Sequence, residues 1–231
     1  MPGLRHLRPP MPKYPVTWNA KDLLLYLKDW KIDAASPLRE ITKKLATLLT
    51  CLSVQRVHTI SLIDSRNIKF DTDATYTYIF EDLKVQRIRP KFVITLPTLH
   101  EDDPLETSLL LRIYWDKTAA FRRSNAQDGF PDRLFLSYVT SYRPIMTDTL
   151  ARWVRGVLKA AGIDTTVFGA HSVRGAAASA ARNSNAPLDA ILSAGDWSSA
   201  RTFNRHYFRS NAFLPHSQVA RILTSCVIDS K

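Results

Sequence analysis

Residues 171–181 of the chain read HSVRGAAASAA, which joins a charged pair to a run of small side chains. His171 and Arg174 lie three positions apart, so on a helix both side chains face the same way and can grip one anionic group together. The small residues that follow allow such a helix to pack very close to its neighbours. The stretch therefore predicts a closely packed helix that starts with an anion-binding pair. A surface helix with ordinary charges is the alternative, because His206 and Arg209 repeat the same spacing.

Downstream of this helix there is a single tyrosine, Tyr207, in a basic stretch with Arg201, Arg205 and His206. A phenol that attacks phosphorus needs its proton removed and the phosphate charge neutralised, which is work for histidine and arginine. Tyr207 is therefore a candidate nucleophile. Taken alone, a tyrosine four residues after Phe203 is more often a packing residue.

Upstream, Arg56 follows an apolar segment in the stretch SVQRV, residues 53–57. A charge between valines is costly unless it meets an anion, which can be a ligand phosphate or a carboxylate such as Asp64. From these residues alone, the carboxylate is the favoured partner. Lys84 lies between two expected strands, where a lysine is usually solvated.

The chain of 231 residues is strongly basic, with a formal net charge of +11 and a pI near 9.8. Residues 1–50 hold nine Lys and Arg against four Asp and Glu, and residues 150–210 hold eight against three, whereas residues 51–149 balance thirteen against thirteen. A basic surface attracts phosphate backbones and releases their counterions. Nucleic acid is the favoured partner, although acidic proteins and membrane surfaces attract the same charge.

Other classes of site find little support. Cys51 and Cys226 lie far apart without Cys or His at ligand spacing, which argues against disulfides and a zinc site. With seven glycines the chain has no phosphate-cradling loop, and it contains no His-Glu-x-x-His helix. The acidic residues 101–103 precede an expected helix, so we interpret them as a cap region. No apolar run approaches the ~20 residues that cross a membrane and no signal peptide is evident, so we expect a soluble, intracellular protein that is not secreted.

The hydrophobic pattern predicts an α+β domain that is mainly helical and holds one small antiparallel sheet. Thr17 is expected to cap a first helix that reaches Trp30, and Ser36-Pro37 opens a second helix with apolar residues at helical spacing. Runs rich in Thr, Tyr, Ile and Val predict strands at Thr75–Phe80 and Phe92–Leu96. Further helices are expected at residues 103–121, 147–161, 171–183, 188–194 and 199–209.

In chain order, the candidate residues resemble the active site of one family, the phage-integrase-like tyrosine recombinases. That family shows the order Arg, Lys, His-x-x-Arg, His or Trp, Tyr, and the chain matches it with Arg56, Lys84, His171, Arg174, Trp197 and Tyr207. The surrounding words are most similar to recombinases of DIRS-type and Ngaro-type retrotransposons: Pro12-Lys13-Tyr14, Trp18, Gln55-Arg56, Asp132-Arg133-Leu134-Phe135, His171-Ser172-Val173-Arg174-Gly175-Ala176, Asp196-Trp197-Ser198 and Thr202-Phe203. The resemblance runs from about residue 10 to residue 209.

The resemblance implies the tyrosine recombinase catalytic fold and a transesterification of double-stranded DNA that uses no metal, nucleotide or other cofactor. Tyr207 would form a 3′-phosphotyrosyl link, while Arg56 and Arg174 would hold non-bridging oxygens with planar forks that lysine cannot imitate. His171 would hydrogen-bond the phosphate or accept the tyrosine proton. Trp197 would hold a non-bridging oxygen through its indole N–H.

Lys84 would protonate the leaving 5′-oxygen, and Lys91 lies close enough to compete for that role. The residues expected to bind the DNA around the site are Arg201, Arg205, Lys91 and Arg182. Tyr207 follows Trp197 by ten positions, where bacterial and phage integrases commonly have nine, so His206 is the neighbouring alternative. Thr59 stands where many members of the family have an acidic residue, three positions after the first arginine. The group that orients Arg56 must therefore be another residue.

The resemblance also implies an organisation and a setting. We expect a Pro-rich arm or linker over residues 1–16, a catalytic domain over residues 17–210, and a tail over residues 211–231 that docks on a neighbouring protomer. The family carries a DNA-clamping domain before the catalytic one, so the chain looks like a catalytic fragment. It would act in DNA integration or recombination of a mobile element, as a homo-tetramer on two DNA duplexes, and in the nucleus if the host is eukaryotic.

Two other functions fit the same residues. One is a DNA-binding or architectural protein that has lost catalysis, which the full set of candidate residues argues against. The other is a relaxing enzyme like the type IB topoisomerases, which shares the chemistry and needs no partner duplex.

Overall fold

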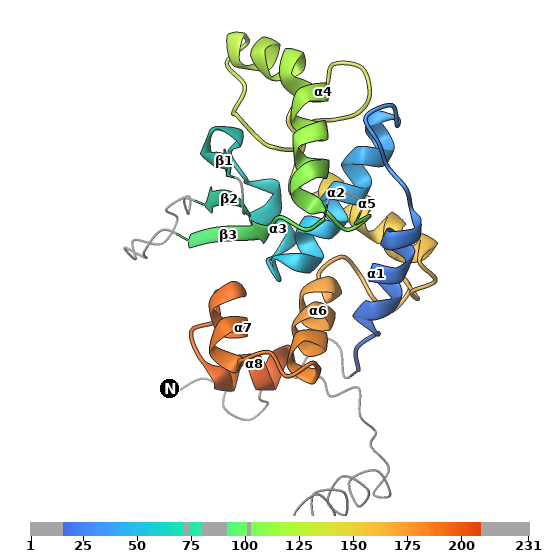
Figure 1. The fold of residues 1–231 in the computed structure, drawn as a ribbon, viewed down its shortest axis with the longest axis vertical. Helices are drawn as coiled ribbons and strands as arrows, with labels where there is room; N and C mark the ends of the chain where they lie inside the picture. Colours follow the sequence, from blue (N-terminus) through green and yellow to red (C-terminus); the bar gives the residue numbers. More distant parts are fainter. Residues whose placement is uncertain (1–15, 72–73, 80–91, 101–102, 209–231) are drawn as a thin grey trace, which may run out of the picture.

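The computed structural model describes residues 16–71, 74–79, 92–100 and 103–208. This part of the chain forms eight α-helices, one 3₁₀ turn and three strands (Figure 1). In chain order they are α1 (Ala20–Asp29), α2 (Leu38–Leu52), α3 (Val57–Ser61), η2 (Ser65–Asn67), β1 (Ile68–Phe70), β2 (Ala74–Ile79), β3 (Phe92–Pro97), α4 (Thr107–Gln127), α5 (Thr147–Ala160), α6 (Ser172–Asn183), α7 (Leu188–Ala194) and α8 (Ala200–His206). The mainly helical α+β prediction is confirmed. No helix in these ranges is long and apolar enough to span a membrane.

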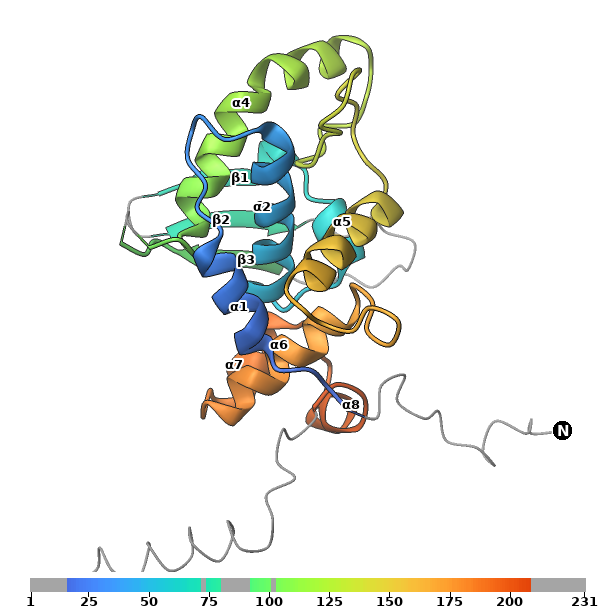
Figure 2. The same cartoon turned by 90° about the vertical axis from the view of Figure 1, so that its right-hand side faces the viewer.

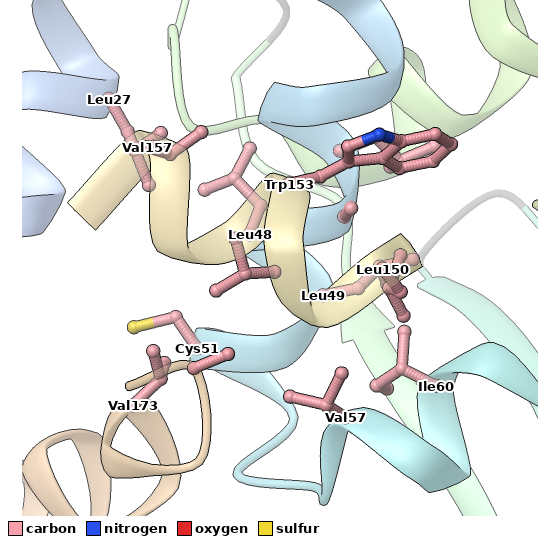
Figure 3. Packing of buried hydrophobic residues seen from close by; sticks show 14 of the residues in the cluster. Leu27, Leu48, Leu49, Cys51, Val57, Ile60, Leu150, Trp153, Val157 and Val173 are labelled. Atoms are coloured by element: carbon pink, nitrogen blue, oxygen red, sulfur yellow. The ribbon is translucent and has the colours of Figure 1, made fainter. Parts of the chain in front are cut away.

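Helix α2 lies at the centre of the main hydrophobic core. It packs against α4, α5 and α6, and almost every side chain from Ile41 to Cys51 is buried. Figure 3 shows Leu48 and Leu49 of α2 among side chains of α5, and Cys51 close to Val173 of α6. A helix that is buried all round must also satisfy its polar side chains. Three threonines of α2 do so by donating to the carbonyl four residues back: Thr42 at 2.6 Å, Thr47 at 2.8 Å and Thr50 at 2.7 Å.

The sheet is antiparallel, as the sequence predicted, and its strand order is β1-β2-β3. Ile68 of β1 pairs with Thr77 of β2, and Tyr76 of β2 pairs with Thr95 of β3. In β3, Ile94 and Leu96 are buried while Thr95 between them is exposed, which is the period-two pattern of a half-buried strand. The sheet therefore joins the core through one face of β3. Lys84 and Lys91, in the connection between β2 and β3, lie outside the described residues.

The expected boundaries of three helices, α1, α4 and α8, are wrong. The cap of α1 is Asn19 and not Thr17, since the Asn19 side chain accepts the Lys21 N–H at 3.1 Å. Helix α4 begins at Thr107 and not near residue 103, because the Glu106 carboxylate accepts the N–H of Ser108 at 2.8 Å and caps the first turn. The same helix runs to Gln127, beyond residue 121, because no breaker precedes Gly129, whose φ is +77°.

Helix α8 ends at His206, so the third correction concerns the expected helix over residues 199–209. The backbone of Tyr207 has φ −122° and ψ −42° and caps the helix, and its carbonyl accepts the Ser179 hydroxyl of α6 at 3.2 Å. This bond ties the end of α8 to α6. Tyr207 is therefore fixed at a helix end rather than carried inside a helix.

Helices α6, α7 and α8 gather at one end of the molecule, and a quarter turn leaves them together there (Figures 1 and 2). They enclose a second, smaller hydrophobic cluster of buried residues: Val54, Ala178, Ile191, Trp197 and Phe203. Helix α6 belongs to both clusters, because its Val173 and Ala176 also enter the main core. The small side chains of α6 permit this, and a Cβ on Gly175 would be in ordinary van der Waals contact with the Tyr207 carbonyl oxygen, at 3.6 Å. The expected helix of small residues is thus found, and it packs against both clusters.

Candidate active site

A cavity of about 390 Å³ opens where the main core meets α6 and α8. Four of the site residues predicted from the sequence line this cavity: Arg56, His171, Arg174 and Tyr207. The first and the last of them are 151 positions apart in the chain. Its other lining residues are Val16, Thr17, Gln55, Val57, Phe168, Ser172, Gly175, Thr202 and His206. The fold thus brings together residues for which the sequence showed only their order along the chain.

Arg174 is the buried charge of this site, with 3% of its surface exposed. One of its terminal nitrogens donates to the carbonyl of Gly195, while Nε and Nη1 are buried and meet no hydrogen-bond acceptor among the described residues. Burial, together with the smaller effect of the nearby positive charge of Arg56, lowers the pKa of the Arg174 guanidinium to about 10. The group is still charged at neutral pH. A buried cation with two unused donors is suited to bind an oxyanion.

Trp197 packs against this guanidinium. The Arg174 Cζ lies 4.2 Å from the centre of the Trp197 ring, within the range of a cation–π contact. Trp197 is itself buried, and its Nε1 has no acceptor within the described part of the chain. A Cβ on Gly195 would lie 2.0 Å from the Trp197 ring, so the indole can occupy this place only because residue 195 is glycine.

The Tyr207 ring completes the cluster. Its centre lies 5.0 Å from the Arg174 Cζ and 4.9 Å from the Trp197 ring, with the two ring planes at 58°. Tyr207 is partly exposed, and Tyr207 and Arg174 both line the cavity. The candidate nucleophile and the buried cation therefore border the same space.

Arg56 and His171 lie at the exposed side of the cavity. Arg56 is the N-cap residue of α3, and His171 is the residue just before α6, with φ −66° and ψ −21°. The carboxylate partner that the sequence favoured for Arg56 is wrong. Asp64 instead pairs with Arg66 at 2.6 Å, because Asp64 caps the turn that contains Arg66.

The candidate DNA-binding arginines are exposed. Arg201 and Arg205 lie on α8, the helix that contributes Thr202 and His206 to the cavity, and Arg182 lies in the last turn of α6. Arg182 reaches the Ala186 carbonyl at 3.5 Å. The remaining candidates, Lys84 and Lys91, fall outside the described residues.

The sequence missed several parts of the site. Trp18 donates through its indole Nε1 to the Ser172 hydroxyl at 2.8 Å, which ties the segment before α1 to the first turn of α6. Val16 and Thr17 consequently form part of the cavity wall. Gln55 and Gly195 were also missed as site residues. A glycine two positions before a buried tryptophan was the one local signal, whereas the other contacts join segments far apart in sequence.

A metal site is not evident in the described ranges, where no three residues among His, Cys, Asp and Glu are grouped as ligands. The cavity is instead lined by arginine and histidine side chains, which suit an anionic ligand.

Residues 31–212 match the model of the Phage integrase family. A comparison with curated protein sequences found no match.

Solved structures give the fold. The chain is similar to the XerH site-specific recombinase bound to a difH substrate, with a TM-score of 0.61 and 13% identity over 90% of this chain and 53% of that one. It is similar to the XerA recombinase with a TM-score of 0.61 and 15% identity, over 92% of this chain and 65% of that one. A lambda integrase dimer bound to a core site matches with a TM-score of 0.51 and 20% identity, over 86% of this chain and 61% of that one.

The chain spans about half the length of the XerH recombinase that it matches. Because the family match covers more than half of the chain and the fold agrees with it, the chain belongs to the phage integrase family and has the catalytic fold of tyrosine recombinases.

Proposed function

We propose that the chain cuts and rejoins strands of double-stranded DNA, with Tyr207 as the nucleophile. The observation that carries the proposal is the contact of the Tyr207 ring with the Arg174 guanidinium, in a cavity that also holds Arg56 and His171. The buried, unused Nε and Nη1 of Arg174 and the Nε1 of Trp197 are the donors that a scissile phosphate would take. The net charge of +11 favours approach to DNA.

In the proposed step the Tyr207 oxygen attacks the phosphorus, a bond between them forms, and the bond to the 5′-oxygen breaks. His171 accepts the phenol proton, and Lys84 or Lys91 gives a proton to the departing 5′-oxygen. Arg56 and Arg174 neutralise the charge on the non-bridging oxygens. The product is a 3′-phosphotyrosyl link and a free 5′-hydroxyl, and attack by such a hydroxyl reverses the reaction without an external energy source.

The solved relatives support DNA as the partner, since the XerH and lambda integrase structures are of DNA-bound proteins. We propose residues 17–210 as the catalytic unit, acting as a tetramer on two duplexes. The sequence words shared with DIRS-type and Ngaro-type recombinases favour a role in integration or recombination of a mobile element. In a eukaryotic host that role places the protein in the nucleus.

A nicked suicide substrate in the presence of EDTA tests the proposal. The wild-type protein is expected to form a covalent adduct with DNA, because the nick releases the 5′-end and blocks the reverse step. Tyr207→Phe is expected to form none, while Tyr26→Phe on α1, which does not line the cavity, serves as the matched control. An adduct that persists in Tyr207→Phe would remove only the nucleophile assignment, and His206 would be tested next.

The two alternative functions are distinct outcomes of the same assay. DNA binding without any adduct would identify a protein that has lost catalysis. Adduct formation followed by relaxation of supercoiled DNA, without junctions between two duplexes, would identify a relaxing enzyme. Junctions between two duplexes would identify a recombinase.

A further inference from the structure

Two arginines must bind one phosphate in the proposed reaction, yet they are attached to different parts of the molecule. Arg56 precedes α3, whose Val57 and Ile60 are buried in the main core. Arg174 points toward the turn of Gly195 and Trp197, which belongs to the smaller cluster. The distance between the two guanidinium groups therefore depends on what joins the residues before α3 to the turn after α7.

Val54 and Gln55 make that connection. Val54 is buried in the smaller cluster with Trp197 and has φ +56°, a backbone conformation that β-branched residues rarely adopt. Only surrounding contacts can hold a valine there, and such strain is often found beside functional sites. Gln55 follows with 2% of its surface exposed, and its backbone N–H donates to the Ser53 hydroxyl at 3.3 Å.

The Gln55 side chain crosses to the end of α7. Its Nε2 donates to the carbonyl of Ala194, the last residue of that helix. The next carbonyl along the chain, that of Gly195, accepts from Arg174. Two consecutive carbonyl groups of one turn thus accept hydrogen bonds, that of Ala194 from Gln55 and that of Gly195 from Arg174. The Trp197 N–H closes the turn on the Leu192 carbonyl at 2.9 Å.

We propose that Gln55 is a positioning residue of the proposed cleavage reaction: it fixes the turn of Gly195 and Trp197, and through it the Arg174 guanidinium, relative to Arg56. Gln55 also lines the cavity, so the link lies beside the space in which the phosphate would bind. A shift of this turn moves the Gly195 carbonyl and the Trp197 ring together, and these are two of the groups that hold Arg174. The inference rests on the proposed function of the site.

The substitution Gln55→Met tests the inference, because methionine fills a similar volume and has no donor for the Ala194 carbonyl. Gln127→Met, at the exposed end of α4, is the matched control. We expect single-turnover cleavage of the suicide substrate to fall about 100-fold in Gln55→Met, since a misplacement of about 1 Å can cost that much. DNA affinity is expected to stay within about twofold, because the charges that bind phosphates are unchanged. Gln55→Asn keeps the amide but is one methylene too short, and it tests the same link if Gln55→Met does not fold.

A second measurement is independent of catalysis. In a spectrum of protein with ¹⁵N-labelled tryptophan, the indole signal of Trp197 is assigned through Trp197→Phe. We expect this signal to shift in Gln55→Met and to stay in place in Gln127→Met.

The outcomes separate this inference from the proposed function. If wild type and Gln55→Met cleave at the same rate and the Trp197 signal does not move, the positioning role is overturned and the proposed function stands. If the wild-type protein forms no adduct, the proposed function fails, and the Trp197 signal alone decides whether Gln55 holds the turn.

Discussion

The Arg174 Cζ lies over the Trp197 ring, 4.2 Å from the ring centre, and both side chains are buried. The guanidinium thus contacts the indole ring, and one of its terminal nitrogens donates to the Gly195 carbonyl. The other two nitrogens remain to bind a ligand. Only a planar group with several donors can contact the ring, bond to the Gly195 carbonyl and bind a ligand at the same time. This requirement distinguishes arginine from lysine at this position.

Arg174→Lys is expected to reduce cleavage of the suicide substrate by about 100-fold or more, because the positive charge is kept but the planar set of donors is lost. DNA affinity measured by fluorescence anisotropy is expected to remain close to that of wild type. Arg152→Lys, on the exposed side of α5, is the matched control. Near-normal cleavage by Arg174→Lys would exclude Arg174 from the site.

Gly195→Ala is expected to lower the free energy of unfolding by roughly 1–3 kcal/mol, because the new Cβ would overlap the Trp197 ring and force it to move. Cleavage is expected to fall together with stability. Gly156→Ala is the matched control on α5: nothing lies within 4 Å of its added Cβ, and alanine there is expected to add about 0.5–1 kcal/mol. Urea denaturation measures the free energy of unfolding of both variants. Equal midpoints for Gly195→Ala and Gly156→Ala would contradict the predicted overlap between the new Cβ and the Trp197 ring.

The bond between Trp18 and Ser172 is expected to show energetic coupling. Ser172→Ala leaves the buried Trp18 indole N–H without its acceptor, at an expected cost of about 1–3 kcal/mol. Trp18→Phe is expected to cost less through this bond, because the Ser172 hydroxyl still donates to the Gly169 carbonyl at 2.7 Å. In the double variant the second loss is expected to be smaller, with a coupling energy of about 1 kcal/mol from a double-mutant cycle in urea. Strictly additive losses would show that the two side chains act separately.

Lys44 gives the fold a dependence on pH. Its Nζ is buried in α2 and donates to the Trp30 carbonyl at 2.5 Å, and burial lowers the pKa of the ammonium group to about 8. In the unfolded chain the pKa returns to about 10.5, so the unfolded state binds more protons between these two values. The contribution of Lys44 to the free energy of unfolding therefore rises as the pH increases from 8 to 10.5.

This dependence is measured as the difference in unfolding free energy between wild type and Lys44→Met at several pH values. The comparison cancels the titration of other groups, such as Cys51, whose buried thiol has its pKa raised to about 12. We expect the unfolding free energy of wild type to rise relative to that of Lys44→Met as the pH increases from 8 to 10.5. Lys28→Met is the matched control for loss of one exposed positive charge, and a difference that does not change with pH would contradict the effect.

Several features of the protein follow from the sequence alone, because they depend on neighbours along the chain. The apolar repeat of α2 and the start of α6 at the His171-Arg174 pair are local, and both elements are found where their periodicity predicted them. The alternation of Ile94, Thr95 and Leu96 likewise identified a strand. The order of residue types also singled out Arg174, Trp197 and Tyr207, which the fold brings into contact.

Other features were decided only by tertiary structure, because they are contacts between segments far apart in sequence. Arg56 lines the cavity with Arg174 and Tyr207, whereas Asp64, the partner that the sequence favoured for Arg56, pairs with Arg66. Ser179 of α6 donates to the Tyr207 carbonyl at the end of α8, and Trp18 joins the segment before α1 to Ser172. A sequence can show that a residue is polar or charged, but the partner that satisfies it in a low-dielectric interior is known only once the chain has folded.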